Sequence, residues 1–111
     1  MTESPIDLAT YRELQDTAGA EFVAELVGTF LEEAPAMLAD LRAAHEAADA
    51  DRFRRAAHSL KSNSQAFGAR VLGALARELE LGGLEGDAAR LDSLEAEYGR
   101  AAAALKELSH G

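Results

Sequence analysis

The side chains best suited to take part in chemistry lie around one histidine. His58 has Arg54 and Arg55 one helical turn before it, and Lys61 and Ser62 one turn after it. On a helix, residues three and four positions apart are neighbours on the surface. A neutral imidazole nitrogen is a nucleophile near pH 7, an ammonium group pairs with anionic oxygens, and a small hydroxyl leaves space for an approaching protein. The spacing fits an accessible nucleophile, and if it takes up a phosphoryl group, Lys61 could pair with the oxygens of that group. It fits an exposed histidine without a chemical role equally well.

The helix predicted over 51–67 places this histidine outside the core. At 100° per residue, His58 lies about 140° from the centre of the apolar stripe, and Gln65 lies close to it at about 120°. We therefore expect His58 to point toward solvent, with Arg54, Arg55 and Gln65 as supporting neighbours. The stripe expected to face the core consists of Phe53, Ala56, Ala57, Leu60, Ser64 and Phe67.

The distribution of charge also favours an anion at this helix. The chain carries 11 Lys and Arg against 20 Asp and Glu, a net charge of -9. No acidic residue occurs from Arg52 to Arg77, a segment with six basic residues, so the rest of the chain has 5 basic and 20 acidic residues, or -15. An acid-free basic segment in an acidic protein is typical of a site that binds an anion. Composition drift along one helix is the alternative.

Helix formers dominate the sequence, and helix breakers divide it. Ser4-Pro5 predicts the start of a short helix that ends before a turn at 16–19, and Pro35 predicts another start, because proline suits the first turn of a helix. Asp49 is in position to cap the helix that follows it. Short connections predict antiparallel neighbours in an all-α, up-down bundle. The further helices are expected over 20–33, 35–48, 51–67, 69–81 and 86–108, with Asp87 in the first turn of the last.

Composition excludes several classes of protein. The net negative charge argues against nucleic acid as the main partner. No apolar run approaches the roughly 20 residues of a membrane helix, and the N-terminal sequence lacks the regions of a secretory signal. The chain has no cysteine, which excludes disulfides and thiol chemistry. We therefore expect a single cytoplasmic domain over residues 1–111.

The other polar residues form no recognised catalytic or metal pattern. His45 and His110 lack a second ligand at metal-binding spacing, so no metal site is expected. The serines near His58 have no local His and Asp partners for acyl transfer. The glycines over 82–86 fit a turn between helices and not a nucleotide-binding loop. His58 is thus the strongest candidate for chemistry.

The residues around His58 resemble the signature of histidine-containing phosphotransfer (HPt) domains. The stretch 57–69 reads AHSLKSNSQAFGA. It matches the family at the histidine, at the leucine and lysine that follow, at the small residue after the lysine, and at the apolar residue before Gly-Ala. Asn63 is a mild departure, at a position that is usually small. The flanks are similar as well, at Ile6-Asp7, in the helix from Phe22 to Phe30, at the junction 32–35 and at Leu79-Glu80.

The resemblance implies a fold and a role for each matching residue. The fold is an antiparallel four-helix bundle with one or two short N-terminal helices. His58 is the phosphorylated residue, usually through Nε2, Lys61 neutralises the phosphate, and Ser62 gives the partner room. Gly68 matches the glycine that closes the helix of the site. Glu80 matches a position whose side chain orients the imidazole, although a role as a solvated surface residue is the alternative for Glu80.

The resemblance also implies partners. The family relays a phosphoryl group between aspartates of receiver domains in multistep two-component signalling. Response-regulator receiver domains are therefore the expected partners, together with a hybrid sensor histidine kinase, and the chain is expected to be a monomer without kinase activity. The receiver supplies the aspartate and Mg²⁺, so no cofactor is expected on this chain. Leu8 and Tyr11 are candidates for an apolar docking rim, and they fit the core equally well.

Two alternatives stay open on the sequence. In the first, the chain is a helical adaptor that binds partners through its surface, with His58 unmodified. In the second, it is a fragment of a histidine kinase whose ATP-binding domain lies elsewhere. Met1 and the N-terminal helix start favour a free-standing protein.

Overall fold

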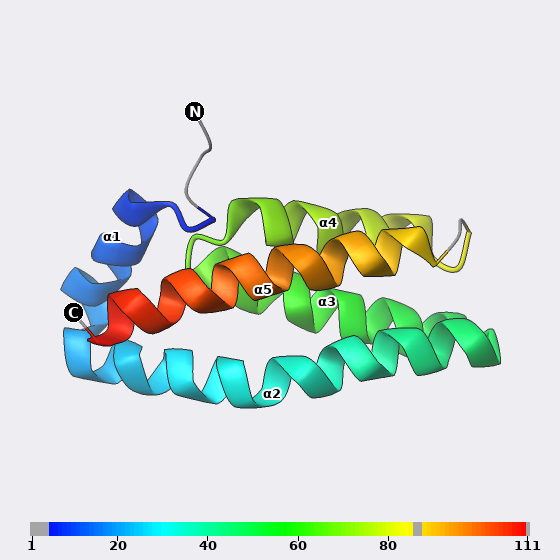
Figure 1. Cartoon of the computed structure of the whole chain (residues 1–111), viewed down its shortest axis with the longest axis horizontal. Helices are drawn as coiled ribbons and strands as arrows, with labels where there is room; N and C mark the ends of the chain where they lie inside the picture. Colours follow the sequence, from blue (N-terminus) through cyan, green and yellow to red (C-terminus); the bar gives the residue numbers. More distant parts are fainter. Residues whose placement is uncertain (1–4, 86–87, 111) are drawn as a thin grey trace.

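Helices make up all the regular structure in the part of the chain that is described. The computed structural model describes residues 5–85 and 88–110 (Figure 1). The predicted all-α class is confirmed. The helices are α1 (Leu8–Ala18), α2 (Ala20–Ala47), α3 (Ala50–Ala66), α4 (Arg70–Gly82) and α5 (Ala89–His110).

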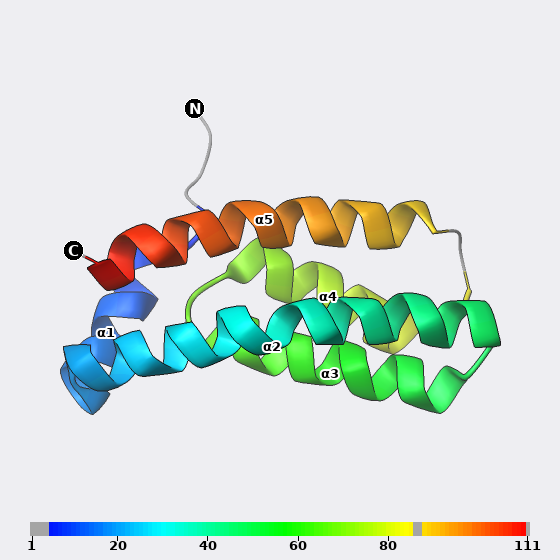
Figure 2. The ribbon, with the colours of Figure 1, turned by 60° about the horizontal axis from the view of Figure 1, so that its bottom comes forward.

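Four of the helices form the expected antiparallel bundle. α3 packs against α2 and α4, and α5 packs against the same two helices. Within the described residues the backbones of α3 and α5 do not approach each other closely, so the two helices lie at opposite corners of the bundle. α1 lies across one end, against α2 and α3 (Figures 1 and 2). The outer side of α3, which carries His58, is therefore left open along the length of the bundle.

The two helices predicted over 20–33 and 35–48 are one continuous helix, and that prediction is wrong. α2 runs from Ala20 to Ala47 with Pro35 inside it. An internal proline removes one backbone hydrogen bond and costs roughly 3 kcal/mol. The apolar face of α2 continues across the proline, because Phe30 and Ala34 before it and Leu41 after it are all buried. Packing of this unbroken face against α3 and α5 offsets the loss.

The ends of the other helices lie close to their predicted positions. α1 begins at Leu8, after Asp7, whose carboxylate accepts a hydrogen bond of 2.6 Å from the Thr10 hydroxyl. It continues to Ala18, three residues into the predicted turn, and stops where Gly19 takes a φ of 94°. The predicted start at Ser4 and the predicted first-turn Asp87 lie outside the described residues.

The core joins all five helices. Tyr11 of α1 is buried, whereas Leu8 is 41% exposed, so Tyr11 belongs to the core and Leu8 stays available at the surface. The ring of Phe30 on α2 lies 5.5 Å from that of Phe67 at the end of α3 and 6.0 Å from that of Tyr98 on α5. Aromatic contacts at these distances contribute beyond the area they bury. They fix the C-terminal end of α3 relative to its neighbours.

Candidate functional site

α3 is anchored at its N-terminal end and along its inner face. The Asp49 carboxylate accepts a hydrogen bond of 3.1 Å from the backbone N–H of Arg52, which confirms the predicted cap. The predicted core stripe is also confirmed, since its members are buried except for Ala56, which is half-buried. Ser64, the polar member of the stripe, donates its hydroxyl to the Leu60 carbonyl at 2.6 Å. This anchoring fixes which side of α3 faces outward.

The turn after α3 requires the glycine that the sequence singled out. Gly68 has a φ of 82°, and a Cβ at this position would lie 2.8 Å from the backbone oxygen of Asp7. The backbone N–H of Asp7 donates to the Gly68 carbonyl at 2.7 Å. A side chain here would therefore meet both an unfavourable backbone conformation and the N-terminal segment. Gly68 ends α3, and its backbone also binds the segment that leads into α1.

A second glycine, which sequence reasoning missed, brings α4 close to α3. Gly73 is buried, and a Cβ there would lie 3.1 Å from Cγ of Gln65. Glycine inside a helix costs about 1 kcal/mol relative to alanine, so its presence indicates a packing reason. That cost is the signal from which Gly73 could have been found. The close approach brings the outer edges of α3 and α4 together.

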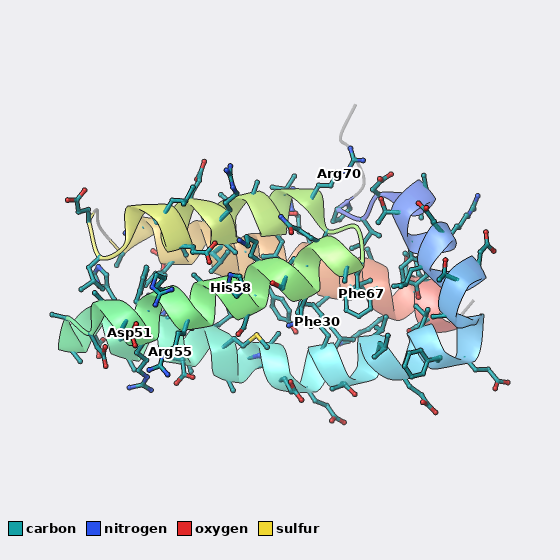
Figure 3. All side chains as sticks on the ribbon, turned by 180° about the vertical axis from the view of Figure 1, so that it is seen from behind. Phe30, Asp51, Arg55, His58, Phe67 and Arg70 are labelled. Carbon is teal, nitrogen blue, oxygen red and sulfur yellow. The ribbon has the colours of Figure 1, made fainter. Side chains whose placement is uncertain are left out.

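His58 lies on this shared edge with its ring exposed. The side chain is 58% exposed, on the outer side of α3 (Figure 3). Its Nδ1 lies 2.5 Å from Oε2 of Glu80 on α4, which is the contact expected for Glu80. The other oxygen of the same carboxylate, Oε1, accepts a hydrogen bond of 2.6 Å from Nζ of Lys61. One carboxylate of α4 thus holds two side chains of α3.

This bridge determines which ring nitrogen of His58 can act as a nucleophile. The Glu80 side chain is 14% exposed. The ammonium of Lys61 and, to a smaller extent, the imidazole of His58 lower the pKa of the Glu80 carboxyl, against a desolvation that raises it. Glu80 is therefore an anion at neutral pH, and an anionic carboxylate is a hydrogen-bond acceptor alone. Nδ1 of a neutral His58 must then carry the ring proton, which leaves the lone pair on Nε2.

The arginines predicted to support His58 are bound to carboxylates instead. Arg54 and Arg55 both pair with Asp51 on the same helix, at 2.9 and 3.3 Å. Arg52 pairs with Asp40 of α2 at 2.6 Å, and Arg70 pairs with Asp7 at 2.9 Å. Asp51, Arg55 and Arg70 are labelled in Figure 3. Acidic residues outside the basic segment thus neutralise much of its charge.

The two remaining predicted neighbours lie on the outer side of α3. Ser62, one turn after His58, is exposed, and so is Gln65. Asn63, the departure from the family pattern, donates its side-chain amide to the Ser59 carbonyl at 2.8 Å. It therefore turns back onto its own helix. The surface beyond His58 toward the end of α3 carries small or neutral side chains.

The comparisons with known proteins identify the family. The model of the Hpt domain family matches residues 25–104, which is most of the chain. No curated protein and no solved structure matches it. The chain belongs to the Hpt domain family, a family of helical bundles that carry a phosphoryl group on histidine in phosphorelays and interact there with receiver domains and kinases. Family members are phosphocarriers rather than enzymes.

The residues that the structure describes offer neither a metal-binding cluster nor a helix that could span a membrane. No group of three or more His, Asp or Glu side chains among them could hold a metal ion. Among the helices that are described, none combines the length and the apolar character needed to cross a membrane.

Proposed function

We propose that this protein relays a phosphoryl group through Nε2 of His58, between the aspartates of receiver domains in a multistep two-component phosphorelay. The observation that carries the proposal is the contact between Nδ1 of His58 and the Glu80 carboxylate. It supports a ring whose lone pair lies on Nε2, and the ring is more than half exposed. A relay needs a nucleophile that a second protein can reach, and this arrangement supplies one.

The transfer follows from this arrangement. The Nε2 lone pair attacks the phosphorus of a receiver's phosphoaspartate, and the new N–P bond forms as the P–O bond to the aspartate breaks. The aspartate leaves as a carboxylate with the electron pair of that bond. Nδ1 keeps its proton, so the ring gains positive charge, which the Glu80 carboxylate stabilises, as a carboxylate does for the histidine of a catalytic triad. The reverse sequence returns the phosphoryl group to a second receiver.

The neighbours of His58 act by charge and by size. Phosphoryl transfer is mostly positioning and charge neutralisation, so little further chemistry is needed from the carrier. Lys61 supplies positive charge beside the ring, and Glu80 positions both side chains. Ser62 is small and exposed one turn from His58, which leaves a partner room to approach. The Mg²⁺ that neutralises the transferred group is supplied by the receiver.

We propose in addition that the chain is a carrier without kinase activity and without a resident cofactor. Its partners are response-regulator receiver domains and a hybrid sensor histidine kinase. We expect it to act in the cytoplasm as a monomer, with residues 1–111 forming one domain. Membership in a family of phosphocarriers supports this part of the proposal.

Transfer of a radioactive phosphoryl group tests the proposal directly. A panel of phosphorylated receiver domains is mixed with this protein and Mg²⁺, and the label on the chain is followed for wild type and for His58→Gln. His45→Gln, a substitution of the same type on α2, is the matched control. We expect acid-labile, alkali-stable label on the wild type and on the control, and none on His58→Gln. Label that persists in His58→Gln would place the phosphoryl group on another residue and contradict the proposal. The absence of label from wild type with every receiver would favour the adaptor alternative.

A further inference from the structure

Arg77 stands apart from the other basic residues of the acid-free segment. The remaining five each pair with a carboxylate: Arg52 with Asp40, Arg54 and Arg55 with Asp51, Lys61 with Glu80, and Arg70 with Asp7. The side chain of Arg77 is exposed, and it makes no hydrogen bond or ion pair with any residue that the structure describes. An exposed guanidinium without a carboxylate partner has its N–H donors available for an incoming anionic group.

The helix places Arg77 one turn from Glu80, the residue that contacts the imidazole. Gly73, four residues before it, faces Gln65 on the outer edge of α3. Glu80, three residues after it, contacts His58. Residues at these spacings lie on one face of a helix, about 5–6 Å apart between neighbouring Cβ atoms. Arg77 therefore lies on α4 between two residues that face the outer edge of α3, within one helical turn of the partner of His58.

Lys61 is poorly placed to neutralise a phosphoryl group alone. Its ammonium is bound to the Glu80 carboxylate at 2.6 Å, and its side chain is 19% exposed. A phosphoryl group on Nε2 brings about two negative charges at pH 7. The planar guanidinium of an arginine binds such a group through two parallel hydrogen bonds, and its long side chain can follow the group outward. Arg77 combines this chemistry with a charge that no described carboxylate holds.

We propose that Arg77 pairs with the phosphoryl oxygens on phosphorylated His58 and so stabilises the phosphorylated form of the protein. The inference rests on the proposed function, because it assumes that Nε2 of His58 carries the group. Arg77 contributes a fixed charge and two N–H donors. Its effect falls on the equilibrium between the phosphorylated protein and the phosphorylated receiver.

The equilibrium constant of transfer isolates this contact from docking. For the exchange between a phosphorylated receiver and this protein, the constant depends on the free proteins before and after transfer. A residue that contacts the receiver only in the complex changes the rate and leaves the constant unchanged. We therefore expect Arg77→Gln to lower the constant about fivefold, the range of an exposed charge pair. Arg77→Lys keeps the charge without the planar fork, and we expect a drop of about twofold.

Lys106→Gln is the matched control for net charge. It also removes one positive charge, from α5, which lies at the opposite corner of the bundle from α3. The control is expected to leave the equilibrium constant unchanged. A second readout is the side-chain Nε–H resonance of Arg77, which should shift when His58 is phosphorylated with phosphoramidate in the absence of any receiver.

Each outcome decides the proposal. An unchanged constant in Arg77→Gln overturns it, and a slower initial rate with that unchanged constant would assign Arg77 to receiver docking instead. An equal drop in Lys106→Gln would show a general charge effect and also overturns it. A wild type that takes up no phosphoryl group from either source contradicts the proposed function itself. A wild type that is phosphorylated at His58 with no response in Arg77 contradicts this inference alone.

Discussion

Two edges of the bundle, between α2 and α5 and between α3 and α4, carry ion pairs that have different consequences. On the edge between α2 and α5, Arg42 binds Glu95 through two hydrogen bonds of 2.7 and 2.8 Å and binds Asp92 at 2.6 Å. One cation there satisfies two carboxylates. On the edge between α3 and α4, one carboxylate, that of Glu80, binds both Lys61 and His58. The first arrangement joins two helices, and the second also orients a ring whose far nitrogen stays accessible.

The difference lies in which partner keeps a lone pair. A guanidinium has N–H donors and no lone pair for nucleophilic attack, so Arg42 can bind anions but cannot take up a phosphoryl group. An imidazole has two distinct nitrogens, so occupation of Nδ1 by Glu80 leaves Nε2 for chemistry. An ion pair between helices becomes part of a reactive site when one member has a second functional atom directed to solvent.

The largest expected effect separates the two edges by activity. His58→Gln should abolish phosphoryl uptake, because an amide nitrogen is not a nucleophile at neutral pH. Arg42→Gln should change the rate of uptake less than twofold, because the α2–α5 edge lies away from Nε2. Initial rates of label transfer from one phosphorylated receiver measure both. A large loss of phosphoryl transfer in a folded Arg42→Gln variant would contradict the conclusion that only the α3–α4 edge takes part in transfer.

Glu80 should matter next, through the orientation of the ring. Glu80→Ala removes the acceptor at Nδ1, so the imidazole loses its fixed tautomer and orientation, and we expect transfer about tenfold to a hundredfold slower. Glu78→Ala, on the same helix and exposed, is the matched control and should transfer at the wild-type rate. In ¹⁵N spectra of the His58 ring, wild type should show the proton on Nδ1, and Glu80→Ala should show the mixture of free histidine. Equal rates in the two variants would contradict a positioning role for Glu80.

Substitutions at the α2–α5 edge should lower the stability of the protein more than substitutions at the α3–α4 edge, which is the reverse of their expected effects on phosphoryl transfer. Arg42→Met leaves the carboxylates of Asp92 and Glu95 next to each other without a cation, and we expect the midpoint of thermal unfolding to fall by about 3–5 °C. Lys61→Met leaves Glu80 with His58 as its remaining partner, and the expected fall is smaller. Circular dichroism at 222 nm measures both midpoints. A greater loss in Lys61→Met would show that the α3–α4 edge is the stronger link.

The smallest expected effect is a pH dependence shared by both edges. Lys61 lowers the pKa of Glu80 and Arg42 lowers that of Glu95, each below the ordinary value of 4.5. A carboxylate with a lowered pKa in the folded state stabilises the protein above its unfolded pKa, and this contribution is lost as the pH falls through the folded value. Wild type should therefore lose stability below about pH 4.5.

Two amide variants assign that acid loss to its sources. Glu80→Gln and Glu95→Gln each remove one titrating group, so each should lose less stability between pH 5 and pH 3 than wild type does. Urea unfolding at a series of pH values measures the difference. Acid profiles of both variants that parallel that of wild type would show that neither edge contributes.

Much of the site follows from local patterns in the sequence. The 3.6-residue period of apolar side chains in 51–67 places His58 on the outer side of α3, and Asp49 and Gly68 mark the ends of that helix. The resemblance to the HPt family adds Glu80 as a partner of the ring. The prediction of a helix start at Pro35 was wrong because the sequence shows the local cost of the proline. The packing that offsets this cost depends on helices far away in the chain.

The amino-acid sequence by itself determined the helical class, the outward direction of His58 and the membership of the family, because these depend on periodicity and on short motifs. Tertiary structure alone decided how the charges are partnered. It joined Arg52 to Asp40, Arg70 to Asp7 and Lys61 to Glu80, each across separate segments, and gave Arg77 no partner in the described chain. Electrostatic pairing depends on distances of a few ångströms between side chains remote in sequence, and packing of the bundle sets those distances.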